Sequence, residues 1–132
     1  MSFTTHHTGT NWEENAGFSQ VITVPADHSL IVTAGQVAFD DDAQVVGEGN
    51  VEAQTRKSFD NLERTLNAAD ATMNDVIKLR YSITDRSHYD TVKAVRDEYL
   101  SEPHPTGMLA VLDELAMPEL LVEIEALAAV PE

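Results

Sequence analysis

Two acidic residues, Glu123 and Glu125, lie inside the most apolar run of the chain, residues 119–130. Side chains alternate between the faces of a strand, so a strand built from this run places both glutamates on one face. A carboxylate among large apolar groups must be solvated, paired or protonated, because burying it alone is prohibitively costly. The pair therefore indicates either a half-exposed edge strand with two surface acids or a polar site enclosed by a partner subunit.

Other reactive groups are scarce in this sequence. The chain has no cysteine, which excludes disulfides, thiolate nucleophiles and cysteine-ligated metals. His104, directly before Pro105, is either a loop residue or a pocket residue. We predict no metal site and no cofactor, because no spacing typical of metal ligands relates the other histidines, His6, His7, His28 and His88.

The charge balance is strongly acidic, with 23 Asp and Glu against 8 Lys and Arg and a net charge of −15. The acids are spread along the chain, a distribution typical of proteins from a halophilic cytoplasm, where high salt screens self-repulsion. The same charge argues against nucleic acid as a partner, because binding phosphates requires a basic stripe and none is visible.

Length and composition predict one folded domain over residues 1–132, with residues 1–16 as a loosely ordered N-terminal segment. Hydrophobic residues make up 42% of the chain, which favours a packed core over disorder. No apolar stretch reaches the 18 or so residues of a membrane span, and no secretory signal is visible, so we expect a cytoplasmic protein without a membrane partner.

The hydrophobic pattern predicts two helices among five strands. Residues 51–69 have apolar side chains at helical spacing behind Asn50 as N-cap, and Ser87 with Asp90 resembles a capping box that starts a second helix. Strands are predicted at residues 18–24, 30–34, 77–83, 108–115 and 120–130, which gives the order β-β-α-β-α-β-β.

This order implies an α+β fold with a single sheet and both helices on one face. The other face carries Lys78, Arg80, Glu123 and Glu125, which make it too charged for a core and too apolar at its edges for free surface. We therefore expect a symmetric oligomer to enclose that face.

Four stretches resemble the RidA/YjgF family, small proteins with a chorismate-mutase-like (ferredoxin-like) fold, and the likeness runs from Gly17 to Val130. Together the stretches are specific, because they occur in the family's order and at its spacing. They are Ala16-Gly17-Phe18-Ser19-Gln20, Thr33-Ala34-Gly35-Gln36-Val37, Val51-Glu52-Ala53-Gln54-Thr55-Arg56 with Asn61-Leu62, and Val122-Glu123-Ile124-Glu125-Ala126.

The resemblance implies a homotrimer that binds small molecules in clefts between adjacent subunits. In deaminating members a glutamate on the last strand, Glu123 here, positions a water that hydrolyses an imine or enamine to a keto acid. One carboxylate can both orient that water and shuttle the proton. An arginine two residues after a proline grips the substrate carboxylate in those members.

This sequence departs from the family's pattern at three positions around that pocket: Gly107 replaces the arginine, Phe18 the tyrosine and Ala34 a serine. We therefore expect weak turnover of ordinary 2-imino acids unless a cation reaches the cleft from elsewhere. Arg80 either supplies that cation or pairs with Glu123 or Glu125. The expected site comprises Glu123 as acid/base, with Phe18, Ala34, Gly35, Arg80 and Gly107 around the ligand.

Two functions follow from these residues. The first is an enzyme of the imine or enamine deaminase type with an altered site, and the second is a non-catalytic trimer that binds a small ligand or has a regulatory role. A third function, endoribonuclease or translation inhibitor, is a label attached to some relatives. The acidic surface and the absence of a nucleophile–base pair disfavour it.

Overall fold

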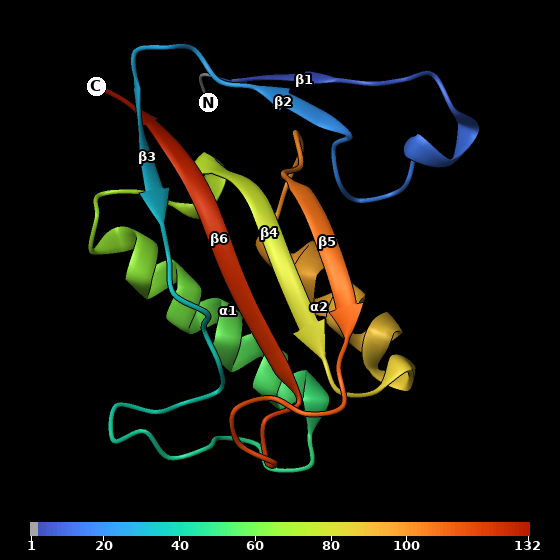
Figure 1. Cartoon of the computed structure of the whole chain (residues 1–132), viewed down its shortest axis with the longest axis vertical. Coiled ribbons are helices and arrows are strands. Elements are labelled where there is room, and N and C mark those ends of the chain that lie inside the picture. Colours follow the sequence, from blue (N-terminus) through green and yellow to red (C-terminus); the bar gives the residue numbers. More distant parts are fainter. Residues whose placement is uncertain (1–2) are drawn as a thin grey trace.

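The structure, a computed structural model, describes residues 3–132. Two helices and six strands follow one another along the chain, joined by loops and three short 3₁₀ turns (Figure 1). The strands are β1 (Thr4–His6), β2 (Val21–Thr23), β3 (His28–Val32), β4 (Val76–Ile83), β5 (Thr106–Val111) and β6 (Val122–Pro131), and the helices are α1 (Val51–Asn67) and α2 (Tyr89–Tyr99).

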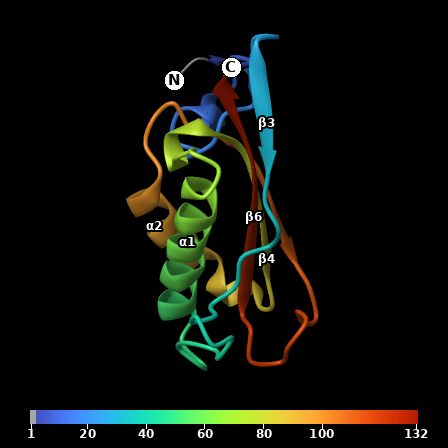
Figure 2. The same ribbon diagram turned by 90° about the vertical axis from the view of Figure 1, so that its left-hand side faces the viewer.

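The main sheet has four strands in the order β3-β6-β4-β5. β6 is antiparallel to both of its neighbours, and β5 is parallel to β4 because α2 forms the crossover between them. Figure 2 shows both helices on one side of this sheet and no helix on the other. The predicted α+β class with both helices on one face is confirmed.

Several boundaries differ from the prediction. β2 pairs with β1 in a separate two-stranded sheet and does not join the main sheet. β1 escaped prediction because Thr4-Thr5-His6 has no hydrophobic alternation. The second helix starts at Tyr89 and not at Ser87, because Asp85 first caps a 3₁₀ turn over residues 86–88. The predicted N-cap of α1 is confirmed, since the Asn50 side chain accepts a hydrogen bond from the backbone N–H of Ala53.

The core lies between the helices and the main sheet, where apolar residues of α1 meet those of β4 and β6. Gln54 of α1 is fully buried there, and its side chain links the segment directly before β6 to the helix. Its Nε2 donates to the Glu119 carbonyl at 2.8 Å, and its Oε1 accepts from the Leu121 N–H at 2.8 Å. These bonds fix the backbone two residues ahead of Glu123, so the helix positions the strand that carries the candidate acid.

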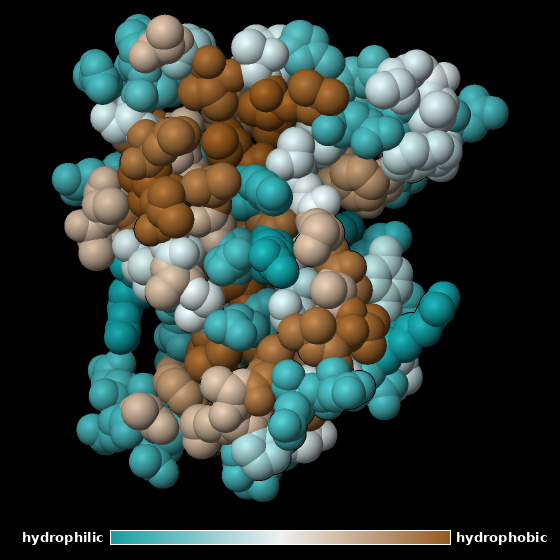
Figure 3. All heavy atoms as spheres, viewed as in Figure 1, coloured by the Kyte–Doolittle hydropathy of each residue, from teal (hydrophilic) through white to brown (hydrophobic). Residues whose placement is uncertain are grey.

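The face of the sheet away from the helices is open, and it carries Lys78, Arg80, Glu123 and Glu125 as predicted. Exposed apolar side chains border these charges: Leu30 is 65%, Val32 73% and Met108 48% exposed. Figure 3 shows this face, with apolar side chains bordering a polar central band. A patch of this kind marks an interaction surface.

Within residues 3–132, no helix is long and apolar enough to cross a membrane.

Candidate functional site

A bulge in the segment after β3, residues 33–36, lies against β6 next to Glu123. The Thr33 N–H donates to the Ala126 carbonyl at 3.1 Å, and Gln36 exchanges two backbone hydrogen bonds with Ile124 at 2.7 and 3.0 Å. Two residues, Ala34 and Gly35, therefore face the single residue between Ile124 and Ala126 on β6. An extra residue of this kind bends the chain and redirects its side chains, as β-bulges do beside active sites. We call residues 33–36 the Gly35 bulge.

Side chains from α1 hold the segment around the Gly35 bulge in place. Asn61 donates through Nδ2 to the carbonyls of Val37 and Phe39, at 2.9 Å each. Thr65 donates through its hydroxyl to Gln36 Oε1 at 3.2 Å. The Thr33 hydroxyl in turn accepts the Ala126 N–H at 3.0 Å. A bulge fixed from both sides presents its backbone to β6 in one conformation.

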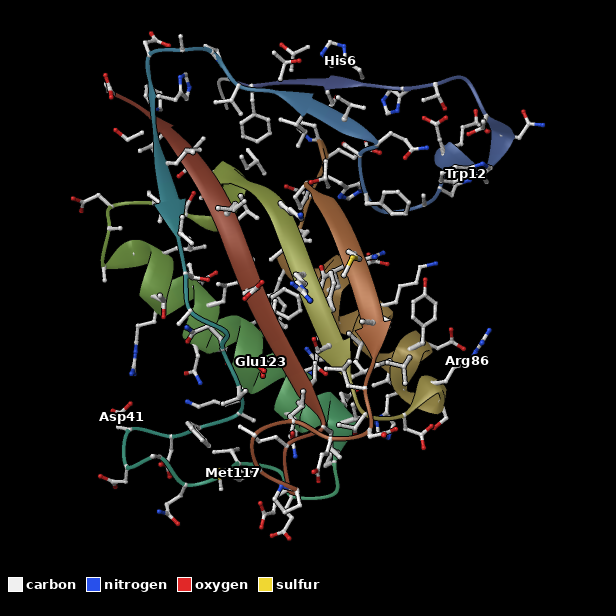
Figure 4. The ribbon with its side chains drawn as sticks, in the orientation of Figure 1. His6, Trp12, Asp41, Arg86, Met117 and Glu123 are labelled. Carbon is white, nitrogen blue, oxygen red and sulfur yellow. The ribbon has the colours of Figure 1, made fainter. Side chains whose placement is uncertain are left out.

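The Glu123 carboxylate leans over the bulge and lies directly against Gly35. A Cβ atom at position 35 would collide with Glu123 Oε2, so only glycine leaves this space for the carboxylate. Within residues 3–132, no hydrogen bond or ion pair engages the Glu123 side chain. Figure 4 shows Glu123 on the lower part of β6, near the beginning of that strand. This carboxylate is available to orient a water or a ligand.

Replacing Gly35 by alanine should therefore displace the Glu123 carboxylate without unfolding the protein. The new methyl group meets the far end of a flexible side chain, and the Gly35 backbone is not in the left-handed region. We expect the stability to change by less than about 1 kcal/mol, as for most substitutions that avoid the core. A crystal structure of the variant with a different Glu123 rotamer, together with its melting temperature, tests this expectation. An unmoved carboxylate would contradict it.

Glu125, the second glutamate of the strand, is engaged elsewhere. It lies opposite Arg80 in the β4–β6 ladder, and Arg80 Nη1 is 3.9 Å from Glu125 Oε1. Both side chains are about half exposed, at 54% and 48%, so the pair adds little stability. Of the two roles left open for Arg80, the structure shows the pairing with Glu125.

Phe18 and Gly107 meet in a second place, at the beginning of β5. The segment that carries Phe18 is docked there by Ser19, whose N–H donates to the Pro105 carbonyl at 3.0 Å and whose hydroxyl donates to the His104 carbonyl at 2.6 Å. Phe18 and Gly107 line a cavity of about 140 Å³ between β5 and α2, which we call the β5 cavity. His104 lies in the loop before β5 and does not line it.

The structure has space for a side chain at position 107, where the sequence has glycine. It pairs with Leu79 in the parallel ladder, so its notional side chain points to the helix face of the sheet. A Cβ there would lie 3.8 Å from Tyr81 Cε2 and 3.4 Å from the Leu79 carbonyl, both ordinary contacts. A side chain at position 107 would therefore extend along the β5 cavity.

The sequence-predicted site residues fall into two groups within one chain. Ala34, Gly35 and Glu123 belong to the bulge beside β6, whereas Phe18 and Gly107 belong to the β5 cavity. Glu123 is on the open face and Gly107 on the helix face, with β4 between their strands. Figure 4 shows the same separation, because Trp12, whose ring lies 6.1 Å from that of Phe18, is far from Glu123.

Arg96 of α2 is a candidate residue that the sequence analysis missed. Only 11% of its side chain is exposed, and it lines the β5 cavity beside Gly17, where a Cβ would collide with Arg96 Nη2. Gly17 also has a φ of +77°, which favours glycine. Burial raises the pKa of the neighbouring Tyr81 phenol, and the charge of Arg96 opposes that rise. One signal in the sequence could have pointed to Arg96. It directly follows Val95, which belongs to the apolar stripe of its helix, and arginine is rare in this chain.

No group of three or more histidine, aspartate or glutamate side chains among residues 3–132 is arranged to hold a metal ion.

Comparisons with known proteins agree with this architecture. The family model described as Endoribonuclease L-PSP matches residues 9–130. A 2-iminobutanoate/2-iminopropanoate deaminase of Salmonella typhimurium is 30% identical over 102 residues, which cover 76% of this chain and 79% of the relative. The Rid family protein YyfB of Yersinia pestis, described as of unknown function, has a TM-score of 0.88 at 27% identity and covers 98% of this chain and all of its own.

A structure of TdcF from E. coli with bound serine is more distant, with a TM-score of 0.69 at 27% identity over 77% of this chain and 81% of TdcF. The family model covers most of the chain, and the deaminase relative is similar over three quarters of it. The fold agrees with the solved structure of YyfB over nearly the whole chain. The chain therefore belongs to the RidA/YjgF family.

Proposed function

We propose that the protein is a homotrimer that binds a small metabolite between adjacent subunits and hydrolyses an imine or enamine with Glu123 as the acid/base. One observation carries this proposal: the Glu123 carboxylate lies against a glycine with no partner among residues 3–132. Glu125, the other glutamate of this strand, lies 3.9 Å from Arg80 instead. The deaminase relative, which is named for two small imino acids, supports the choice of reaction.

The separation of the two groups of site residues supports assembly into a ring. The Gly35 bulge lies at the β3 side of the sheet, and the β5 cavity lies at the opposite edge. Two different surfaces of one chain meet in a heterologous contact, which generates a closed ring when the rotation between subunits closes. In such a ring the Glu123 of one subunit faces the β5 cavity of the next. The exposed Leu30 and Val32 would be covered in the same contact.

The chemistry needs only a water and a proton shuttle. An imine carbon is already electrophilic, so a water held by the Glu123 carboxylate attacks it while the carboxylate takes up one proton. The same carboxyl group then returns this proton to nitrogen. This gives a carbinolamine. The carboxylate then removes the proton of the new hydroxyl group and passes it to the amino nitrogen as the C–N bond breaks, so ammonia leaves and a carbonyl group remains. An enamine first tautomerises to the imine and then follows the same path.

Subunit mixing tests the shared site directly. Glu123→Gln removes the acid, and Gly107→Phe fills the β5 cavity, so each variant alone should be inactive. Mixed by unfolding and refolding together, the two variants should regain about a quarter of the wild-type activity, because a site needs one intact half from each of two neighbours. A coupled assay that follows imine loss gives the rate, and light scattering gives the mass. An inactive mixture of correctly sized trimers would contradict the shared site.

A non-catalytic trimer that binds a small ligand is the second candidate. It is favoured by the lack of polar side chains at positions 34 and 107, where alanine and glycine offer a ligand no side-chain hydrogen bond. Saturable ligand binding by the wild-type protein without any acceleration of imine loss would select this second function.

A further inference from the structure

We propose that the β5 cavity is an anion site in which Arg96, together with Lys93 and the Tyr81 hydroxyl, holds the carboxylate of a small ligand. Helix α2 would thus supply the guanidinium that position 107 lacks. The proposal rests on the proposed function in one respect: the ligand in this cavity is taken to be the molecule that reaches Glu123. Binding of the anion itself does not require catalysis.

The charges around the cavity favour an anion. Arg96 and Lys93 line the β5 cavity and no acidic residue does, although acids outnumber bases by 23 to 8 in the whole chain. Within the described part of the chain, Lys93 makes no ion pair. On the other side of Phe18 lies a larger open hollow of about 960 Å³. Acids line that hollow and would repel an anion: Glu13, Glu14, Asp97 and Glu102.

Several N–H groups of the Arg96 guanidinium make no hydrogen bond within residues 3–132. A guanidinium carries five N–H groups. Asp97 Oδ1 engages only Nε and Nη2, at 3.1 and 2.9 Å, and Asp97 itself is 53% exposed. The remaining N–H groups belong to a side chain with little access to solvent. A carboxylate in the cavity can accept two of them in the fork geometry that arginine favours.

Tyr81 adds a neutral donor to the same cavity. The residue is only 6% exposed, and its hydroxyl has no hydrogen-bond partner within residues 3–132. The hydroxyl keeps some access to solvent, because it is not among the enclosed polar atoms that lack a partner, so it can donate to a water or a ligand in the β5 cavity that Tyr81 lines. Since burial keeps the phenol protonated, the hydroxyl can donate to an anion.

The volume of the β5 cavity limits the size of the ligand. At about 140 Å³, the β5 cavity is close to a cavity known to hold benzene, so it admits about six or seven heavy atoms. Phe18, Val92 and Leu109 make much of the wall apolar. A short aliphatic carboxylic acid satisfies both the cations and this wall. Inorganic phosphate satisfies only the cations.

Calorimetric titration tests the proposal on the intact Glu123→Gln trimer, in which turnover does not interfere. The probes are 2-oxobutanoate, neutral 2-butanone and inorganic phosphate. We expect saturable binding of 2-oxobutanoate, weakened about 10- to 100-fold by Arg96→Met and about 3-fold by Tyr81→Phe. Arg64→Met is the matched control, because Arg64 lies on α1, is 70% exposed and pairs with Asp41. It should bind like the parent.

A second substitution can distinguish the loss of the Arg96 charge from the loss of its packing. In the Arg96→Met background, Gly107→Arg should recover most of the affinity, because a side chain at position 107 extends along the same cavity. Where Arg96→Met fails to fold, Tyr81→Phe still serves, since the hydroxyl it removes has no partner in the described chain. Equal affinities for 2-oxobutanoate and 2-butanone, or no loss with either variant, would overturn the anion site. Tighter binding of phosphate would overturn the carboxylate assignment.

The two proposals fail separately. Arg96-dependent binding of 2-oxobutanoate without imine hydrolysis by the wild-type protein would remove the enzyme and leave the anion site. Hydrolysis of imines that continues unchanged in Arg96→Met would remove the anion site and leave the enzyme.

Discussion

Replacing Glu123 by glutamine is expected to lower the rate of imine hydrolysis about 10²- to 10⁴-fold, the usual loss when a general acid/base is removed. Glutamine keeps the length and shape of the side chain but can neither accept a proton from the attacking water nor return it to nitrogen. The side chain has no partner among residues 3–132, so the fold loses no contact. The melting temperature should therefore stay close to that of the parent protein. Turnover in the coupled assay and thermal melting together measure both effects.

Glu125→Gln is the matched control for that experiment. It removes the same charge from the same face of the same strand, two residues away, where the carboxylate pairs weakly with Arg80. We expect its rate to stay within about threefold of wild type, because a half-exposed ion pair contributes little. Equal losses from both variants would show that the rate follows the charge of the open face and not the position of one carboxylate. Full activity in Glu123→Gln would remove Glu123 from the mechanism.

The parts of the fold that were predicted correctly are those with strong local patterns. Helix α1 combines an N-cap at Asn50 with an apolar stripe that includes Phe59 and Leu62, so its start was found to the residue. The alternation around Glu123 likewise placed both glutamates on the open face. Local signals of this kind do not depend on the rest of the chain.

The missed parts depend on contacts between distant segments. The three residues of β1 are polar, and they form a strand only because they pair with β2. Arg96 looked like an ordinary surface residue of α2, and its burial arises because Gly17, nearly eighty residues earlier, leaves space for the guanidinium. The expectation of weak 2-imino acid turnover assumed that no other cation reaches the cleft. Arg96 is the cation that we propose for this role, so this expectation now depends on the Arg96→Met experiment.

The melting temperature is expected to rise with added sodium or potassium chloride. Each chain carries a net charge of −15, and the proposed trimer would concentrate three times that charge in one particle. Screening shortens the range of repulsion from about 10 Å near 0.1 M salt to about 3 Å near 1 M. If screening recovers about 3 kcal/mol, the melting temperature rises by on the order of 10 °C for a domain of this size. Thermal melting across a chloride series measures the shift.

Assembly should show the same dependence, and this separates screening from a general effect of solutes. The subunits must approach with like charges, so light scattering at low salt should detect dissociation before or together with unfolding. Sucrose is the control, because it strengthens burial by exclusion from the surface without screening charge. Chloride should therefore stabilise the proposed trimer more than sucrose does at equal osmolarity. A melting temperature that is flat or falls between about 0.1 and about 2 M chloride would refute the halophilic interpretation. The family assignment would stand, because it depends on the fold and the matched residues and not on charge.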